Sequence, residues 1–196
     1  MMKLPIYILA GGRSSRFGSD KARAVVAGRP LLVGLAHVLK SRASRLTVIA
    51  EVSDKYADLG LTTLADVMPG RAPLGGLHTA LQQQRESGWF LLAACDLVAV
   101  RSHWLDLLWA HCSAEDGVVA FRSTRRWEPL FALYHTSIGP TVTEALANNQ
   151  LAMQSLLDRV GAVAVKLPAD WPTVSQINTH DDLEDYLRDQ QDARDG

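Results

Sequence analysis

A glycine-rich, cationic segment follows the first apolar run of the chain, and its residue types suit a polyphosphate ligand. Residues 9–21 read Leu-Ala-Gly-Gly-Arg-Ser-Ser-Arg-Phe-Gly-Ser-Asp-Lys. Glycine at positions 11 and 12 lets a ligand approach the backbone closely. Residues 13–29 hold five cationic side chains and one acidic side chain, in a chain whose net charge is -1. This local excess of positive charge predicts an anionic ligand.

The spacing of this segment excludes two common phosphate-binding motifs. A P-loop ends in Gly-Lys-Ser/Thr, whereas Gly18 is followed by Ser19, Asp20 and Lys21. A dinucleotide-binding fingerprint requires Gly-x-Gly-x-x-Gly, and the glycines of residues 11–18 do not have that spacing. An ordinary glycine turn with solvated arginines therefore remains open on composition alone.

Asp96 is the candidate metal ligand. An apolar run over residues 89–94, typical of a buried strand, leads into Cys95 and Asp96. A carboxylate at the end of a strand is well placed to bind Mg²⁺ on a nucleotide. On position alone, Asp96 could equally be a helix cap or a turn residue. Lys21, at the end of the glycine-rich segment, is suited to neutralise charge on a departing pyrophosphate.

Apolar runs of strand length alternate with helical patterns along most of the chain, which predicts an α/β fold with a mainly parallel sheet. Ligands of such sheets bind at the carboxyl ends of the strands, so the segments after Ala10, at Asp66 and at Asp96 should meet at one edge. We expect strands at 5–10, 46–50, 62–64, 89–94, 117–121 and 130–134, and helices at about 30–41, 75–86, 102–113, 137–147, 152–159 and 180–190.

Two local patterns add detail to these helices. Thr179 and Asp182 have the spacing of a capping box at the start of the last helix. Trp104, Leu105, Leu108 and Trp109 fit one helical face and are expected in the core.

Length and composition limit the classes of protein to which the chain can belong. The chain has 196 residues, 47% of them hydrophobic and 21% charged, with no linker-like tract, so we expect one globular domain. The near-neutral charge argues against nucleic-acid binding, and no apolar run is long enough to cross a membrane. Because the N-terminus also lacks the pattern of a signal peptide, a cytoplasmic location is expected. Cys95 and Cys112 lack metal-ligand spacing and are expected to be reduced and packed.

The order of the motif residues resembles that of the molybdenum cofactor guanylyltransferases, a family within the glycosyltransferase-like nucleotidyltransferases. Sequences of that family open with Leu-Ala-Gly-Gly, followed by an arginine, an apolar residue, a glycine and an Asp-Lys pair, as residues 9–21 do. Further matches follow in the family's order at Asp66, Pro-Leu-Gly-Gly over 73–76, Cys-Asp at 95–96, Glu-Pro at 128–129 and Asn-Thr at 178–179. The resemblance covers nearly the whole chain.

The resemblance implies a Rossmann-like, three-layer nucleotidyltransferase fold. It implies one domain over 1–196, with a nucleotide-binding part of about 1–100 and a second-substrate part of about 101–190. The implied reaction transfers GMP from GTP to the terminal phosphate of molybdopterin with Mg²⁺ as cofactor, and transient contact with molybdoenzymes or their chaperones would follow. A cytidylyl- or sugar-nucleotidyltransferase of the same fold, or a non-catalytic GTP-binding partner, stays open.

The resemblance also implies roles for individual residues. Lys21, Asp96 and Arg16 would be catalytic, with Asp96 as the metal ligand. The nucleotide would contact Leu9, Ala10, Gly11, Gly12, Lys21, Asp66, Leu74, Gly75, Gly76 and Asp96, while the second substrate would contact Gln176, Asn178 and Glu128. Taken alone, the glycines at 75 and 76 could instead serve helix packing, and Asp66 or Asn178 could serve turns.

Several family features are absent from this chain, among them the proline that commonly follows the Cys-Asp pair by two positions, where this chain has Val98. Ala72 stands where a glycine usually precedes Pro-Leu. The family often has an asparagine at the end of its second strand, and this chain has Ile49, Ala50 and Glu51 there. Residues 150–155 contain no cation, although a basic residue in this region can help to hold the pterin in the family.

Overall fold

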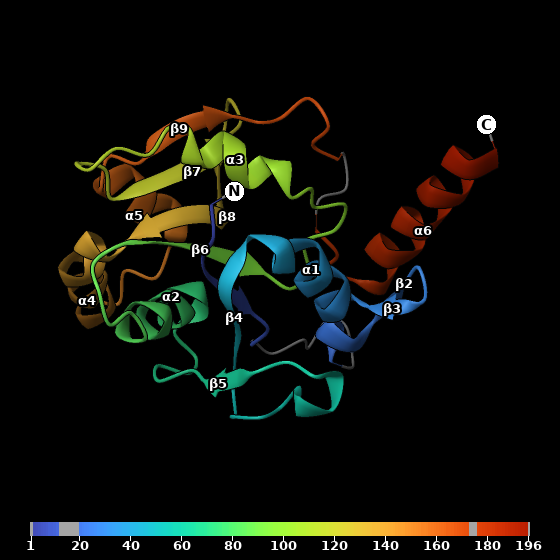
Figure 1. The fold of residues 1–196 in the computed structure, drawn as a ribbon, viewed down its shortest axis with the longest axis horizontal. Helices are drawn as coiled ribbons and strands as arrows, with labels where there is room; N and C mark the ends of the chain where they lie inside the picture. The colour runs from blue at the N-terminus through green and yellow to red at the C-terminus, as the bar shows by residue number, and fades with distance from the viewer. Residues whose placement is uncertain (1, 12–19, 173–175, 196) are drawn as a thin grey trace.

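A seven-stranded sheet with the order β5-β4-β1-β6-β8-β7-β9 forms the middle layer of the computed structural model, which describes residues 2–11, 20–172 and 176–195. Helices cover both faces of this sheet (Figure 1). The strands are β1 (Leu4–Leu9), β4 (Ala43–Ala50), β5 (Thr63–Ala65), β6 (Trp89–Ala94), β7 (Val118–Arg122), β8 (Trp127–His135) and β9 (Val163–Lys166).

The helices connect these strands, and a short hairpin and four 3₁₀ turns complete the described elements. The helices are α1 (Leu31–Leu39), α2 (Ala72–Gln82), α3 (His103–Trp109), α4 (Gly139–Ala147), α5 (Met153–Arg159) and α6 (His180–Asp195). The hairpin is β2 (Val25–Val26) with β3 (Arg29–Pro30), and the 3₁₀ turns are η1 (Lys21–Arg23), η2 (Lys40–Arg42), η3 (Ala57–Leu59) and η4 (Thr136–Ile138).

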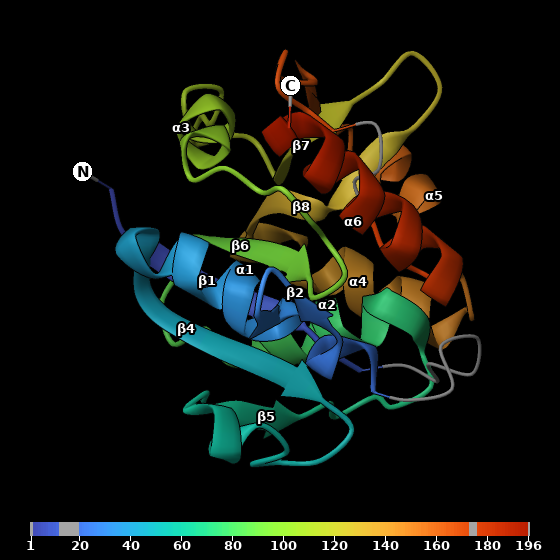
Figure 2. The ribbon, with the colours of Figure 1, turned by 90° about the vertical axis from the view of Figure 1, so that its right-hand side faces the viewer.

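The predicted α/β fold with a mainly parallel sheet is confirmed. β1 pairs in parallel with β4 on one side and with β6 on the other, and β4 pairs in parallel with β5 at the edge seen at the bottom of Figure 2. β8 is the exception, since it runs antiparallel to both β6 and β7. The carboxyl ends of β1, β4, β5 and β6 consequently lie at one edge of the sheet.

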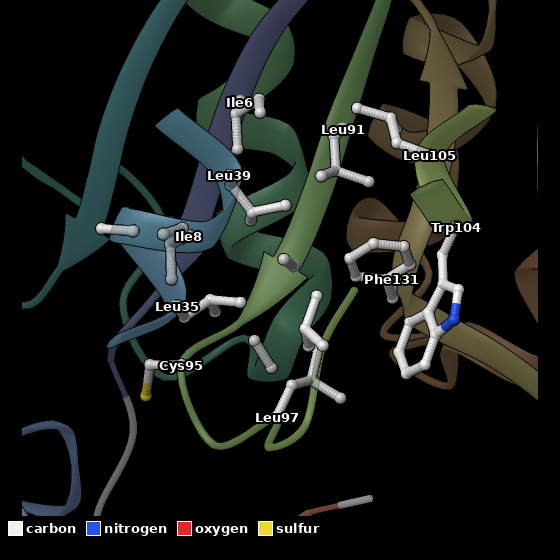
Figure 3. Packing of buried hydrophobic residues seen from close by; sticks show 14 of the residues in the cluster. Ile6, Ile8, Leu35, Leu39, Leu91, Cys95, Leu97, Trp104, Leu105 and Phe131 are labelled. Carbon is white, nitrogen blue, oxygen red and sulfur yellow. The ribbon is translucent and has the colours of Figure 1, made fainter. Parts of the chain in front are cut away.

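Alternating side chains of β1 build the two hydrophobic layers. Ile6 and Ile8 belong to the cluster that contains the apolar faces of α1 and α3, and Figure 3 shows them beside Leu35 and Leu39. Tyr7 and Leu9 belong to the cluster on the other face, under α2, α4 and α5. This period of two is what a strand covered on both faces requires. β1 is therefore the central strand of the core.

Helix α6 contacts the rest of the protein through its first turns and then extends away from the sheet (Figure 1). Tyr186 and Leu183 of α6 pack with Leu31, Val98 and Ile177 in a small third cluster. Among the described residues, no helix combines the length and apolar character that crossing a membrane would need.

The structure corrects several predicted element bounds. The helix expected at 75–86 spans Ala72–Gln82, and the one expected at 102–113 is shorter, at His103–Trp109. Strand β9 and the β2–β3 hairpin were not predicted, because runs of four and two residues carry too little periodicity. The prediction of a buried Trp109 is wrong: its exposed fraction is 39%, whereas Trp104, Leu105 and Leu108 are buried as expected.

A buried arginine joins the connection after α1 to α3. The Arg42 side chain is only 6% exposed, and its guanidinium donates two hydrogen bonds to the carboxylate of Asp106, one with an Nη1–Oδ1 distance of 2.6 Å. A buried guanidinium needs such a partner, because the loss of its hydration is otherwise uncompensated.

We predict that Asp106→Ala lowers the free energy of unfolding by about 1–3 kcal/mol, since it leaves the Arg42 guanidinium buried without its acceptor. Urea denaturation followed by circular dichroism measures the change. Asp185→Ala is the matched control: it removes an exposed pair with Arg188, 3.3 Å between N and O, and should cost less than about 0.5 kcal/mol. Equal losses in the two variants would contradict a structural role for the buried pair.

Candidate active site

A cavity of about 260 Å³ opens at the carboxyl ends of β1, β4, β5 and β6, beside the start of α2. Its walls are mainly apolar, and its charged lining residues are Lys21, Glu51, Asp66 and Asp96. The lining includes six of the residues predicted for the nucleotide site, namely Leu9, Gly11, Lys21, Asp66, Gly76 and Asp96. The sheet thus brings together four segments that are distant in the sequence.

The other predicted nucleotide residues lie elsewhere or outside the described part. Gly12 and Arg16 fall within 12–19, outside the described residues. Leu74 is fully buried in the core under α2, so it supports the wall of the cavity from behind. Ala10 is buried at the end of β1, where its N–H donates to the Ile49 carbonyl at 2.9 Å.

An ion pair between Lys21 and Asp96 is the main polar feature of the cavity. Lys21 Nζ lies 2.6 Å from Asp96 Oδ2, and the two side chains are only 17% and 15% exposed. Lys21 begins η1, which Asp20 caps by accepting the Ala22 N–H at 3.1 Å. Asp96 follows β6, whose end is fixed to β1 by the Cys95 N–H donating to the Leu9 carbonyl at 2.9 Å. The backbones of Lys21 and Asp96 are therefore both held by hydrogen bonds.

Asn178 reaches this pair from the far end of the chain. Its Oδ1 lies 3.3 Å from Lys21 Nζ. The backbone of residues 176–177 runs beside Asp96, with a bridge between Leu97 and Gln176 and the Ile177 N–H donating to the Asp96 carbonyl at 3.0 Å. The predicted proximity of residues 176–178 to the site is therefore present in the structure.

The predicted capping box at the start of α6 is confirmed and holds Asn178 in place. The carboxylate of Asp182 accepts the Asn178 N–H at 2.7 Å and the Thr179 N–H at 2.8 Å, and the Asp182 N–H donates to Thr179 Oγ1 at 3.1 Å. These backbone hydrogen bonds, the one from Asn178 first, lower the pKa of Asp182. Asp182 is thus ionised at neutral pH and fixes the residue that faces Lys21.

Asp96 has a free oxygen that suits a magnesium ion. Oδ2 of Asp96 binds Lys21, while its Oδ1 is buried and has no hydrogen-bond partner among the described residues. A buried carboxylate oxygen without a partner is costly unless a ligand completes it. The described residues contain no cluster of three or more side chains that could hold a metal by themselves. One carboxylate fits Mg²⁺, which is commonly held by one or two carboxylates together with substrate phosphates and water.

Asp66 has a turn role that accounts for one of its oxygens. Oδ1 accepts hydrogen bonds from the Met68 N–H at 2.9 Å and the Thr79 hydroxyl at 2.7 Å. Thr79 Oγ1 in turn accepts the Val67 N–H at 3.1 Å. These bonds hold the turn after β5 against α2, so Asp66 both shapes the cavity and lines it.

Packing leaves little room for a side chain at the two glycines at the start of α2, most strictly at Gly75, which faces backbone. A Cβ at Gly75 would lie 2.5 Å from the Met68 carbonyl oxygen, and one at Gly76 would lie 2.5 Å from Leu9 Cδ2. Gly76 also lines the cavity, whereas Gly75 faces the Asp66 turn. Ala72, which replaces a family glycine, has φ +53°, a left-handed conformation that costs a residue with a Cβ about 1 kcal/mol.

Glu128 stands apart from the ion pair. It lies on β8 two residues before Leu130, which lines the cavity, but Glu128 is not among the described lining residues. Burial raises the pKa of its carboxyl group, and the nearby charge of Arg126 partly opposes this. Beside it, the Gln154 amide bonds both the N–H and the carbonyl of Trp127 at 2.9 Å. Gln154 therefore has a structural task.

Two residues that the sequence did not single out belong to the site's surroundings. Glu51 lines the cavity, and both its carboxylate oxygens lie 3.0 Å from Lys55 Nζ. The fully buried Tyr56 places its hydroxyl between Ala10 and Asp20. No motif marks either residue, because residues 51–60 join two strands without a recognisable pattern. Only the folded chain shows their position.

Cys95 is buried beside Asp96 and is packed as expected (Figure 3). Burial, with a smaller contribution from the charge of Asp96, raises the pKa of its thiol to about 12. The thiol is therefore protonated at neutral pH and is a poor nucleophile. Cys112 is half-buried, and neither cysteine forms a disulfide.

Sequence comparisons identify the relatives of this chain. Residues 6–165 match the family model described as "MobA-like NTP transferase domain". A protein from Deinococcus radiodurans named "Probable molybdenum cofactor guanylyltransferase" is 43% identical over 148 residues, which cover 75% of each chain. A protein of the same name from Flavobacterium johnsoniae is 27% identical over 186 residues, covering 94% of this chain and 97% of the relative.

Solved structures show the same fold. Molybdopterin-guanine dinucleotide biosynthesis protein A from Archaeoglobus fulgidus has a TM-score of 0.79 at 20% identity, over 96% of this chain and 99% of its own. A CMP:2-keto-3-deoxy-manno-octonic acid synthetase complexed with CTP has a TM-score of 0.75 at 11% identity, over 97% and 99% of the two chains. The three-layer nucleotidyltransferase fold expected from the sequence is therefore confirmed.

We predict that Thr79→Val lowers the free energy of unfolding by about 1–3 kcal/mol, because it removes the acceptor of the Val67 N–H and one of the two donors to Asp66 Oδ1. Chemical denaturation measures the loss, and Thr79→Ser should restore most of it. Thr143→Val is the matched control, since Thr143 is an exposed helical threonine that bonds only the Gly139 carbonyl, at 3.1 Å. A loss as large in Thr143→Val would refute the Asp66 turn as its cause.

Proposed function

The chain belongs to the family of MobA-like NTP transferases, and on this premise we propose that it transfers GMP from GTP to the terminal phosphate of molybdopterin, with release of pyrophosphate. One observation carries the proposal: Lys21 and Asp96 meet at 2.6 Å in a cavity at the carboxyl ends of parallel strands. Nucleotides bind at this edge of open α/β sheets.

The proposed reaction requires little acid–base catalysis by the protein. A phosphomonoester has a second pKa of about 6 and is already largely anionic at neutral pH, so the attacking phosphate needs no general base. The protein must place this phosphate in line with the α-phosphorus of GTP and neutralise the charge of the departing pyrophosphate. The apolar walls and the few charges of the cavity suit that task.

Lys21 supplies the mobile cation of the proposed mechanism. Its ammonium group is paired with Asp96 and lies 3.3 Å from Asn178 Oδ1. When triphosphate enters, Lys21 exchanges part of its contact with Asp96 for phosphate oxygens and follows the charge onto pyrophosphate. Arg16, which lies outside the described residues, is proposed as a second phosphate-binding cation.

Asp96 is the proposed ligand of Mg²⁺, because its buried Oδ1 has no partner among the described side chains. When bound, the metal would supply positive charge to the phosphates that react and leave. Asp96 thereby shares its two oxygens between Lys21 and the metal. We therefore propose that transfer of GMP requires Mg²⁺.

The base and the second substrate have separate proposed contacts. The preference for guanine rests on the names of the relatives and on the match of residues 9–21. We assign Gln176 and Asn178, which lie beside Asp96, to the pterin substrate. Glu128, near the start of β8, is proposed as a further contact of the same substrate. Cytoplasmic location and transient transfer of the product to molybdoenzymes complete the proposal.

Nucleotide selectivity is the first test. In equilibrium titrations, GTP with Mg²⁺ should bind at least about tenfold more tightly than CTP or ATP, and removal of Mg²⁺ should weaken GTP binding, because the phosphates would lose part of their neutralisation. With GTP and molybdopterin present, pyrophosphate should be released. Preference for CTP would instead indicate a cytidylyltransferase, and GTP binding without pyrophosphate release would indicate a non-catalytic partner.

We predict that Asp96→Asn lowers kcat by about 10²-fold or more, because the neutral amide loses the charge that attracts the metal and balances Lys21. The same variant should lose the Mg²⁺ dependence of GTP affinity in titrations. Asp185→Asn, on the exposed face of α6, is the control and should keep wild-type values. Turnover retained in a folded Asp96→Asn protein would refute the assigned role.

A further inference from the structure

The glycine-rich segment has two anchored ends, and a single hydroxyl contacts both. Ala10 lies near the first end of this segment of residues 9–21, just after β1, and Asp20 lies near its other end, at the start of η1. Tyr56 Oη lies 3.2 Å from the Ala10 carbonyl oxygen and 3.1 Å from each carboxylate oxygen of Asp20. One phenolic proton thus has acceptors on either side of the segment.

The ring of Tyr56 is held firmly enough to position that hydroxyl. The side chain is fully buried, with an exposed fraction of 0%, among the core residues of one face of the sheet. Two cations lie near its ring: Lys55 Nζ is 5.1 Å and the Arg23 guanidinium carbon 5.4 Å from the ring centroid. Cations at such distances are attracted to the face of an aromatic ring.

The same cations connect the ring to the surrounding acids. Lys55 Nζ lies 3.2 Å from Asp20 Oδ2, and Arg23 pairs with Asp58 at 2.7 Å. Burial raises the pKa of Tyr56 above its ordinary value, so the phenol stays protonated and able to donate at neutral pH. Asp20 therefore accepts from Tyr56, from Lys55 and from the Ala22 N–H at 3.1 Å.

Asp20 is the residue immediately before Lys21, so its orientation sets where the Lys21 ammonium can reach. Lys21 meets Asp96 across 75 positions of sequence, and such a contact depends on a fixed backbone at both partners. Asp96 is fixed by β6, whereas Lys21 is fixed by the η1 turn and by the contacts of Asp20.

We propose that Tyr56 is a positioning residue whose hydroxyl clasps the two ends of the glycine-rich segment, through the Ala10 carbonyl and the Asp20 carboxylate, and thereby aims Lys21 at the nucleotide phosphates. The assignment rests on the proposed function for the identity of the ligand. Tyr56 is not among the described residues that line the cavity, so it acts through Asp20 and Lys21.

Tyr56→Phe tests this clasp, because it keeps the buried ring and both cations and removes only the hydroxyl. We expect the Kd of GTP with Mg²⁺ and the Kd of inorganic triphosphate to rise by the same factor, about 5–10-fold, as a weakened hydrogen-bond clasp would produce. The Kd of guanosine, followed by NMR, should stay within about twofold. Amide hydrogen exchange at Ala22 should accelerate, since its acceptor Asp20 loses one support.

Tyr7→Phe is the matched control. Tyr7 is equally buried, on β1, and its hydroxyl accepts from Arg45 at 2.6 Å and Gln84 at 3.0 Å, away from Asp20. This variant should lose stability to a similar extent and keep the affinities for GTP and triphosphate. A general effect of losing a buried hydroxyl would weaken binding in both variants and would overturn the proposal.

A double-mutant cycle with Asp20→Ala separates the clasp from other effects and remains informative where Tyr56→Phe alone is destabilised. If Tyr56 acts through Asp20, the double variant should bind triphosphate about as weakly as Asp20→Ala alone. If the factors by which the two single substitutions raise the Kd of triphosphate multiply in the double variant, the role of Tyr56 is overturned. The same holds if Tyr56→Phe leaves the affinity for triphosphate unchanged while the wild-type protein binds GTP. Failure of the wild-type protein to bind GTP would instead refute the proposed function.

Discussion

The parallel pairing of β1 with β4 and β6 is the constraint on which the rest of the structure depends. A central strand in such a sheet has neighbours on both edges and helices on both faces, so its side chains must be apolar throughout, as those of Leu4–Leu9 are. Parallel neighbours also require crossover connections, which α1 and α2 help to provide. The carboxyl ends of β1, β4, β5 and β6 meet at the edge where the cavity lies.

The main polar groups at this edge are a pair of opposite charges, one of which has an oxygen without a hydrogen-bond partner among the described residues. Lys21 and Asp96 neutralise one another in a half-enclosed site, but Asp96 Oδ1 has no partner among the described groups. A pair of this kind gains little stability in itself, because the desolvation of both charges offsets their attraction. It places two opposite charges side by side at the cavity, where they can attract charged groups of either sign. The apolar walls around them strengthen that electrostatic effect.

Support for these charges comes from residues that do not line the cavity. Thr79 holds the Asp66 turn, Asp182 holds Asn178, and Tyr56 contacts both Ala10 and Asp20. The supports from Thr79 and Tyr56 use hydrogen bonds between segments that are brought together by packing, whereas the support from Asp182 is local to the start of α6. The antiparallel strand β8 adds a further support, because it joins the sheet beside β6 and carries Leu130 to the cavity.

The fold class, the central strands and six of the residues that line the cavity could be predicted from the sequence, because they follow from local patterns and from the order of the motifs. The apolar runs before Gly11 and Asp96 marked β1 and β6, and the motifs marked Lys21, Asp66 and Gly76. Only the tertiary structure decided that Lys21 pairs with Asp96, that Asn178 joins them across 157 positions, and that Tyr56 connects Ala10 with Asp20. It also decided that Trp109 is exposed and that Ala72 takes a left-handed conformation. These features depend on which distant segments pack together, and that arrangement follows from burial over the whole chain rather than from the spacing of residues within any one segment.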